Sequence, residues 1–330
     1  MTRRAALILS ALVQARPAHS AKAATPVIID TDVGSDDLLA IAFLLSRQDV
    51  QIEAITAVNG LAHVGPGAIN LCRLLTLSGR SNIPVYVGQA EPRQGHRAFP
   101  SDWRRASDEL QGVRLPYPRR MPETPPAVEF LARRLNERSR PVRVLALGPL
   151  TNLAAAFQQT PAWPGLEHLV IMGGALHVPG NLGDGGAFRT DNKTAEWNIF
   201  VDPLAASIVF GSRANMTLIP LDATAKVPID LAFLQEFQKR VQTPLGKFAS
   251  EVLESDRPHI EGGYFQAWDP LAAVALVQPG VVSTKWMSLA VLQGPPQDGR
   301  TVAGQGRDAN VEVALDANAA EFKRVFLSVF

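Results

Sequence analysis

The sequence has one cysteine, almost no net charge and no long hydrophobic run, and each shortage excludes a class of protein. Cys72 is the only cysteine in 330 residues, which excludes an internal disulfide and a cysteine-ligated zinc site. The 32 basic residues nearly balance the 31 acidic ones, so we expect no nucleic-acid partner. Beyond the N-terminus no run approaches the ~20 apolar residues that span a bilayer, so we expect no membrane partner. The remaining composition, 46% apolar, is typical of a globular protein, with Cys72 as a buried core thiol.

The N-terminus differs from the rest of the chain. The basic pair Arg3-Arg4 precedes an apolar run over 5–13, and small residues follow. This order is typical of a secretory signal peptide, and the arginine pair more weakly fits a twin-arginine signal. We therefore expect 1–24 to be a signal peptide of a periplasmic or secreted protein, the alternative being an unstructured extension of a cytoplasmic one. No internal repeat or Gly/Ser linker divides 25–330, which we expect to form one domain.

From Val27 onward, short β-branched runs alternate with helical stretches. This alternation predicts an α/β fold with an open, mostly parallel, doubly wound (Rossmann-like) sheet, helices on both faces and a helical C-terminal part after Pro228. The predicted strands are 27–30, 52–58, 85–87, 142–147, 168–172 and 311–315. The predicted helices are 37–47, 67–77, 127–136, 152–157 and 319–325. The long polar segments 89–126 and 173–194 are predicted to be loops that wall the site.

The strongest chemical signal is IIDTDVGSDD at 28–37, which places four aspartates within eight residues at the end of the first strand. Carboxylates this close repel one another, which raises their pKa values and destabilises the fold unless a cation lies among them. Ca²⁺ and Mg²⁺ are both suitable hard cations. The alternative without a metal ion, an aspartate-rich helix cap, accounts for Asp36 or Asp37 but leaves Asp30 and Asp32 unexplained.

Two later motifs lead to the same edge of the predicted sheet. In LALGPLTNLA, the turn at Gly148 brings the carbonyl of Leu147 to the carboxyl end of a strand, where ligands bind in such sheets. In YFQAWDPLAAVAL, Asp269 stands before Pro270 at a predicted helix start. Taken alone, Asp269 is better explained as a helix N-cap.

Five blocks together make the sequence resemble the inosine-uridine preferring nucleoside hydrolase family. They are DTDVGSDD at 30–37, SNIPVYVG at 81–88, LGPLTNLA at 147–154, VIMGGA at 170–175 with AEWNIFVDPLAA at 195–206, and AWDPLAA at 267–273. The resemblance covers nearly all of 27–330. It implies an enzyme that hydrolyses the N-glycosidic bond of ribonucleosides to base and ribose, acting as a homodimer or homo-oligomer.

The same resemblance implies a Ca²⁺ ion held by the carboxylates of Asp32, Asp37 and Asp269 and by the Leu147 carbonyl. Asp32 would also act as general base for a calcium-bound water. This fits the chemistry, because an oxocarbenium-like ribose needs nearby negative charge and a positioned nucleophile. The implied ribose contacts are Asp36, Asn181, Glu196 and Asn198, with Met172 lining the pocket.

One position departs from the family pattern. After the second strand the family usually has an Asn or Asp, and here the run is AITAVNGLAHVG. Asn59 is near that position but out of register. It is either a ribose or water contact, or a turn residue before Gly60.

The tryptophans are similar to those of the purine-specific, inosine-adenosine-guanosine branch of the family. Trp268 stands where many members have a histidine, and FPSDWRR and TAEWN carry Trp103 and Trp197. The resemblance implies that Trp103 and Trp268 sandwich the base and favour its protonation, and stacking suits the larger purine face. Trp197 and Tyr264 are further candidates for the base pocket. A broad-specificity or pyrimidine nucleoside hydrolase is the alternative.

Two other classes remain open from the residues alone. Asp30-Thr31-Asp32 after a strand is similar to the nucleophile motif of haloacid dehalogenase-like phosphatases with Mg²⁺. An exported nucleoside-binding protein would also be α/β and would hold its ligand with tryptophans. The phosphatase leaves the AEWN and AWDP blocks without a role, and the binding protein does not need four aspartates.

Overall fold

The computed structural model of the chain describes residues 26–160, 162–184, 188–304 and 309–330. The expected signal peptide at 1–24 lies outside the described residues. Among the described helices, none combines the length and the hydropathy that a membrane crossing requires.

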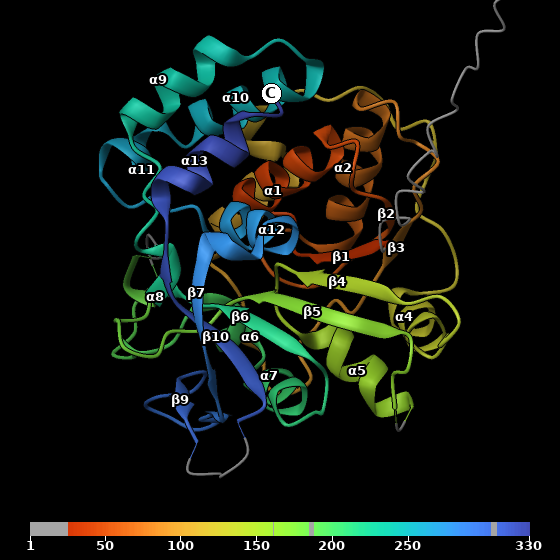
Figure 1. Ribbon diagram of the computed structural model, residues 1–330, viewed down its shortest axis with the longest axis vertical. Coiled ribbons are helices and arrows are strands. Elements are labelled where there is room, and N and C mark those ends of the chain that lie inside the picture. Colours follow the sequence, from red (N-terminus) through yellow and green to blue (C-terminus); the bar gives the residue numbers. More distant parts are fainter. Residues whose placement is uncertain (1–25, 161, 185–187, 305–308) are drawn as a thin grey trace, which may run out of the picture.

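An eight-stranded sheet with the order β3-β2-β1-β4-β5-β6-β10-β7 runs through the molecule (Figure 1). Its strands are β1 (Val27–Thr31), β2 (Ile52–Ala57), β3 (Val85–Val87), β4 (Val142–Ala146), β5 (Leu166–Met172), β6 (Met216–Ile219), β7 (Val282–Met287) and β10 (Val311–Ala317). All neighbours pair in parallel except β7, which is antiparallel to β10. A separate antiparallel pair is formed by β8 (Leu289–Val291) and β9 (Thr301–Ala303). The prediction of an open, mostly parallel sheet is confirmed.

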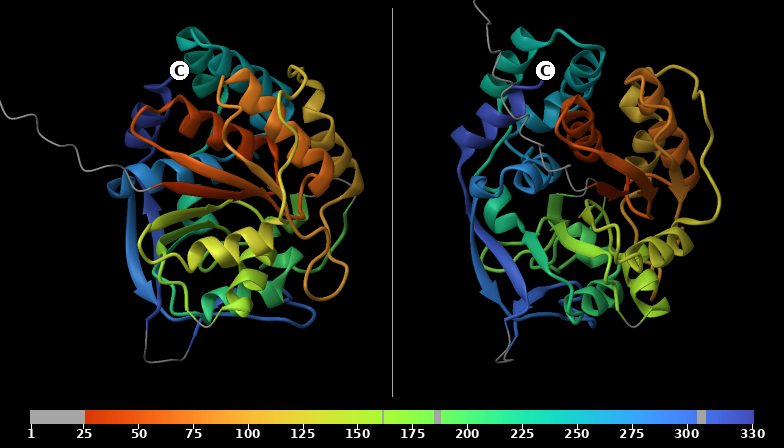
Figure 2. Two further views of the ribbon diagram at one scale, coloured as in Figure 1. Left: turned by 90° about the vertical axis from the view of Figure 1, so that its right-hand side faces the viewer. Right: turned by 45° about the vertical axis from the view of Figure 1, so that its right-hand side comes forward.

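Helices cover both faces of this sheet. The α-helices are α1 (Ser35–Ser46), α2 (Val64–Leu77), α3 (Ser101–Asp108), α4 (Ala127–Leu135), α5 (Thr151–Gln159), α6 (Trp197–Val201), α7 (Pro203–Phe210), α8 (Leu221–Thr224), α9 (Leu231–Arg240), α10 (Pro244–Ser255), α11 (Arg257–Glu261), α12 (Trp268–Val277) and α13 (Ala319–Leu327). The 3-10 helices are η1 (Leu110–Gly112), η2 (Leu182–Asp184) and η3 (Pro279–Val281). Figures 1 and 2 show α1, α2, α12 and α13 on one face and α4, α5 and α7 on the other.

Two apolar cores, one on each face, hold these layers together. One core includes α1, which is buried from Asp37 to Leu45 and packs against α12 and α10. The other core lies under α4, α5 and α7 and includes the fully buried Phe210. Burying an aromatic or large aliphatic side chain stabilises the fold by about 1.5–3 kcal/mol, and the central strands are buried on both faces because helices cover both.

Two predictions about the chain need correction. The segment 89–126 is not only a loop, because it contains α3 and η1. Helix α3 escapes sequence analysis because Ser107 is its only buried residue, so it has no apolar stripe. The part after Pro228 is not only helical before its last strand, because β7, β8 and β9 precede β10. The largely exposed β7 lacks the apolar run that marks a buried strand.

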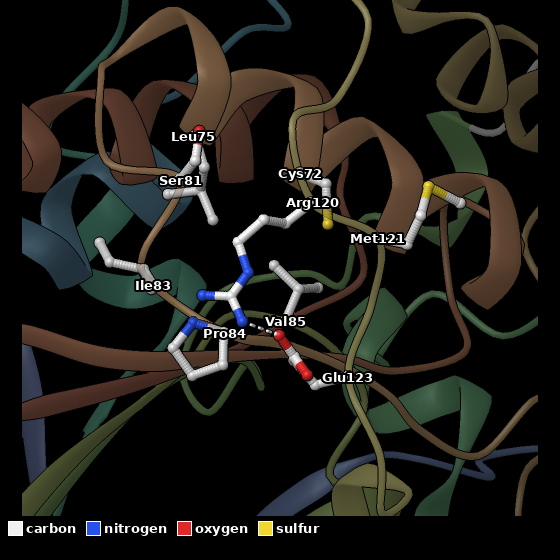
Figure 3. A pocket seen from close by; sticks show the side chains of 9 residues that line it. All are labelled: Cys72, Leu75, Ser81, Ile83, Pro84, Val85, Arg120, Met121 and Glu123. Atoms are coloured by element: carbon white, nitrogen blue, oxygen red, sulfur yellow. Dashed lines mark hydrogen bonds and ion pairs between the residues drawn. The ribbon is translucent and has the colours of Figure 1, made fainter.

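Cys72 is buried, as predicted. It lines a small pocket beside Val85, and the ion pair between Arg120 and Glu123, at 2.6 Å, lies at that pocket (Figure 3). Burial raises the pKa of the Cys72 thiol to about 11. The thiol therefore stays protonated near neutral pH and is a packing group.

A bidentate ion pair joins α4 to β2. Arg134, 3% exposed, donates from Nε and Nη2 to the two carboxylate oxygens of Glu53, at 2.5 and 3.0 Å. Its Nη1 also donates to the carbonyl of Arg140 at 2.6 Å. We predict that Glu53→Ala lowers the free energy of unfolding by about 3 kcal/mol, because a buried guanidinium loses its carboxylate.

Urea unfolding would measure this change. The matched control is Glu137→Ala, since Glu137 lies 3.9 Å from Arg134 and its side chain is 37% exposed. We expect a change below about 1 kcal/mol for the control. Equal losses for the two variants would contradict the assignment.

Candidate active site

The carboxyl ends of four neighbouring strands meet at one edge of the sheet. Asp30 is in register with Thr56 of β2 and with Ala146 of β4, and Ala146 is in register with Ile171 of β5. The segments that follow these strands therefore start side by side. They carry Asp32, Asn59, the Leu147 carbonyl and Gly173 to this edge, where ligands bind in open parallel sheets.

Asp32 is held in one orientation by the loop after β2. Its Oδ2 accepts a hydrogen bond from the amide of Leu61 at 2.9 Å, and its main-chain oxygen accepts one from Ala62 at 2.8 Å. A Cβ at Gly60 would lie 2.0 Å from Asp32 Oδ2, and one at Gly148 would lie 2.9 Å from Asp32 Cβ. Glycine is thus required at both positions for the two loops to approach this carboxylate.

The turn from β1 into α1 fixes Asp37. Val33, just after Asp32, has a φ of 63°, a strained value for a β-branched residue and one that is often found at functional sites. The Thr31 hydroxyl accepts a hydrogen bond from the Val33 amide at 3.1 Å and donates to Asp37 Oδ1. Asp37 Oδ2 accepts one from the Gly34 amide at 2.9 Å.

Four carboxylates gather here, and we call Asp32, Asp36, Asp37 and Asp269 the carboxylate cluster. One oxygen from each of Asp36, Asp37 and Asp269 lies within 4.8 Å of the others. Burial, together with repulsion from Asp37, raises the pKa of Asp32, Asp36 and Asp269 well above the usual range. Both carboxylate oxygens of Asp269 are buried and have no hydrogen-bond partner among the described residues.

Such a cluster can hold a metal ion. Buried carboxylates without partners are unstable unless a cation neutralises them, and hard divalent cations bind carboxylate and carbonyl oxygens. The Leu147 carbonyl adds a neutral oxygen, which accepts a hydrogen bond from Asn198 Nδ2 at 2.8 Å. Asn198 Nδ2 also lies 3.3 Å from the carbonyl of Met172, so the ends of β4 and β5 are joined at this point.

Glu196 and Asn181 contact the backbone. Glu196, 2% exposed, caps α6 by accepting hydrogen bonds from the amides of Asn198 and Ile199, and it accepts another from Gly174 at 2.9 Å. Burial raises the pKa of Glu196. Asn181 Oδ1 accepts a hydrogen bond from the amide of Trp197 at 3.1 Å. Both residues therefore shape the loop between β5 and α6.

An aromatic wall stands beside the carboxylate cluster, formed by Phe99, Trp103, Phe188, Trp197 and Phe200. Trp197 is 4% exposed, stacks on Phe99 with 4.8 Å between ring centroids and tilts against Trp103 at 5.9 Å. Leu61, whose amide binds Asp32, packs on the same wall. The ring of Trp197 is inside the wall, and Trp103 on α3 and Phe188 are partly exposed.

Trp268 directly precedes Asp269, far along the chain from Trp103. It is half-buried and meets the edge of Phe265 at 5.4 Å. In the described part of the chain, Trp103 and Trp268 make no ring contact with each other. Tyr264 is 63% exposed and its ring lies over Gly262.

Asn152, in the LGPLTN block, was not predicted as a site residue, but its side chain forms hydrogen bonds to three segments of the site. Its Nδ2 donates to Asp30 Oδ1 at 2.8 Å and to the carbonyl of Ala57 at 3.0 Å, and its Oδ1 accepts from the Gln89 amide at 2.9 Å. Thr56 also donates to Asp30, at 2.5 Å. The available signal was an amide side chain in the turn after a predicted buried strand, where site residues collect in such sheets.

Asn59 is buried, and its Oδ1 has no hydrogen-bond partner among the described residues. Its backbone amide donates to the carbonyl of Gln89 at 3.0 Å. The side-chain oxygen is therefore free to accept a hydrogen bond from a ligand.

The raised pKa values predict an unusual pH dependence of stability. Burial raises the pKa of Asp30 from 3.8 to about 7, and the pKa values of the carboxylate cluster are raised too. Groups with a raised folded-state pKa stabilise the protein fully below the unfolded value, and this contribution is lost as pH rises through the folded value.

We therefore expect that, in a chelator, the Tm is lower near pH 8 than near pH 5. Added Ca²⁺ should raise the Tm near pH 8 more than near pH 5, because it binds the ionised carboxylates. Scanning calorimetry would measure both effects. A Tm independent of pH and Ca²⁺ would contradict the buried, metal-binding cluster.

Comparison with known proteins identifies relatives along the whole described fold. Residues 27–324 match the family model described as inosine-uridine preferring nucleoside hydrolase. A pyrimidine-specific ribonucleoside hydrolase, RihA, of Salmonella typhimurium is 31% identical over 311 residues, which span 91% of this chain and 96% of the relative.

Solved structures agree with this match. A plant nucleoside hydrolase, PpNRh1, superimposes with a TM-score of 0.83 at 26% identity, over 93% of this chain and 98% of its own. A purine-preferring ribonucleoside hydrolase from Gardnerella vaginalis superimposes with a TM-score of 0.78 at 27% identity, over 92% and 98%. The chain therefore belongs to the inosine-uridine preferring nucleoside hydrolase family, and is an enzyme of the class that hydrolyses N-glycosidic bonds of nucleosides.

Proposed function

We propose that the protein hydrolyses purine ribonucleosides to free base and ribose with a bound Ca²⁺ ion. The observation that carries this proposal is the carboxylate cluster, with the partnerless oxygens of Asp269, beside an aromatic wall. The ligands would be the carboxylates of Asp32, Asp37 and Asp269 and the carbonyl of Leu147. Ca²⁺ suits this set because it accepts 6–8 oxygen ligands, which leaves room for water and ribose hydroxyls.

Bound there, the ion would neutralise the cluster and orient the attacking water and the ribose. Asp32 is the proposed general base. The Leu61 amide binds its Oδ2 and so fixes the orientation of the carboxylate, and a positioned carboxylate can act as general base. The negative charge of the cluster would stabilise the oxocarbenium-like ribose as the glycosidic bond breaks.

The ribose would be held by Asp36, Asn198 and the free oxygen of Asn59, with Met172 in the floor of the pocket. Asp36 offers an oxygen within the cluster, and Asn198 already joins the ends of β4 and β5. Glu196 and Asn181 would keep this floor in place through their backbone hydrogen bonds.

The base would lie between Trp103 and Trp268. A purine gains more contact than a pyrimidine on an indole face, and a base that becomes protonated as it leaves gains a cation–π attraction. The similarity to the purine-preferring relative from Gardnerella vaginalis supports a purine substrate. A pyrimidine nucleoside is the second candidate, favoured by the similarity to the pyrimidine-specific RihA.

The first test is release of hypoxanthine from inosine in the presence of Ca²⁺. We expect Asp32→Ala to lower kcat by at least about 10³-fold, because the general base and one metal ligand are lost together. Chelation should abolish the activity of the wild type. The control is Asp102→Ala, an exposed aspartate on α3. Inosine cleavage that survives both chelation and Asp32→Ala would refute the mechanism.

A second test separates purine from pyrimidine substrates. We expect Trp103→Ala to lower kcat/KM for inosine by roughly tenfold or more, because a stacking ring is lost. The activity on uridine, if present, should change much less, because the smaller ring stacks less. A wild type that prefers uridine would instead support the pyrimidine candidate.

A further inference from the structure

We propose that Asp108 is a positioning residue that fixes Trp103 relative to Asp32. It would link the proposed base-stacking ring to the proposed general base through one hydrogen-bonded path along α3 and the loop after β2. This inference rests on the proposed function, because it assigns Trp103 to the leaving base.

Helix α3 needs such an anchor. It has eight residues, Ser101 to Asp108, and only Ser107 is buried. Isolated helices of this length are unstable in water, so tertiary contacts must determine where α3 lies. One contact is the packing of Trp103 on Trp197, at 5.9 Å between ring centroids. The other is at the opposite end of the helix, at Asp108.

Asp108 makes three hydrogen bonds to α2 and the residue before it. Its Oδ1 accepts from the backbone amide of His63 at 2.8 Å, and its Oδ2 lies 2.7 Å from His63 Nδ1. The carbonyl of Asp108 accepts from Asn70 Nδ2 at 2.9 Å. A carboxylate only accepts, so Nδ1 of His63 carries the proton. Neutral and protonated His63 can both donate this hydrogen bond, so the contact between His63 and Asp108 does not need a charged histidine.

His63 in turn ends the loop that holds Asp32. The amides of Leu61 and Ala62, directly before it, donate to the side chain and main chain of Asp32. The path thus runs from Asp32 to Leu61 and Ala62, along the chain to His63, across to Asp108 and back along α3 to Trp103. Each link is a covalent bond, a helix or a hydrogen bond between described residues.

Loss of the Asp108 carboxylate would remove the two bonds to His63 and loosen the C-terminal end of α3, which would keep only the bond from Asn70 to the Asp108 carbonyl. The bonds from Leu61 and Ala62 to Asp32 would stay in place. Trp103 would lose its position, because small displacements of a positioning group reduce rate strongly. Asp32 would keep its position. The defect should therefore concern departure of the base and leave activation of water intact.

The experiment compares two substrates of the calcium-saturated full chain. Inosine needs help for its leaving base, and p-nitrophenyl riboside releases a phenolate that leaves unaided. We expect Asp108→Ala to lower kcat/KM roughly tenfold for inosine and less than about twofold for the phenyl riboside. Asp108→Asn, which keeps one acceptor oxygen for the His63 amide, should retain part of the inosine activity. Asp102→Ala, on the same helix, should match the wild type on both substrates.

A double-mutant cycle with Trp103→Ala provides the readout that a merely structural role would not move. If Asp108 acts through Trp103, Asp108→Ala should have little further effect on inosine in the Trp103→Ala background. Additive losses, or equal losses on both substrates, would overturn the proposal. If Asp108→Ala does not fold, the same comparison with Asp108→Asn decides. A wild type that cleaves neither substrate would instead refute the proposed function itself.

Discussion

The constraint on which the site depends is the close packing of the four carboxylates of the carboxylate cluster where β1 meets α1 and α12. Desolvation and mutual repulsion both oppose ionisation of these groups, and the two oxygens of Asp269 have no hydrogen-bond partner among the described residues. A cation is the simplest way to satisfy such an arrangement. Much of the surrounding structure serves to bring these carboxylates together, at a cost to stability that protonation or a bound cation would offset.

The sheet brings the site residues to one edge, and the loops that follow its strands orient their side chains. Parallel register places the ends of β1, β2, β4 and β5 at one edge. Gly60 and Gly148 let two loops reach the side chain of Asp32. Asn152 joins β1 to the end of β2 and to the segment after β3. The strain at Val33 lies in the same turn, as expected where geometry serves a ligand more than it serves stability.

The proposed recognition of the base has a different physical basis from the carboxylate cluster. The aromatic wall is a packed apolar group in which Trp197 is buried and Trp103 is partly exposed. The helix that carries Trp103 has little core of its own, so its placement depends on contacts made at both ends. A family whose members differ in base preference could change this helix and its anchors without disturbing the buried cluster.

The fold class, the main strands and the acidic motif at 30–37 could be predicted from local patterns, namely buried β-branched runs and four close aspartates. The proposed ligands Leu147 and Asp269 were implied only by the resemblance to the family. The sequence also carries the expectation of export, in a segment at 1–24 outside the described residues. Helix α3 and β7 were missed, because mostly exposed elements lack the apolar periodicity that marks them. The three-dimensional structure was needed to show that Trp197 packs inside the wall, that Glu196 binds backbone amides, and that Asn152 and Asp108 join distant segments. These roles depend on contacts between residues far apart in the chain, which no local pattern encodes.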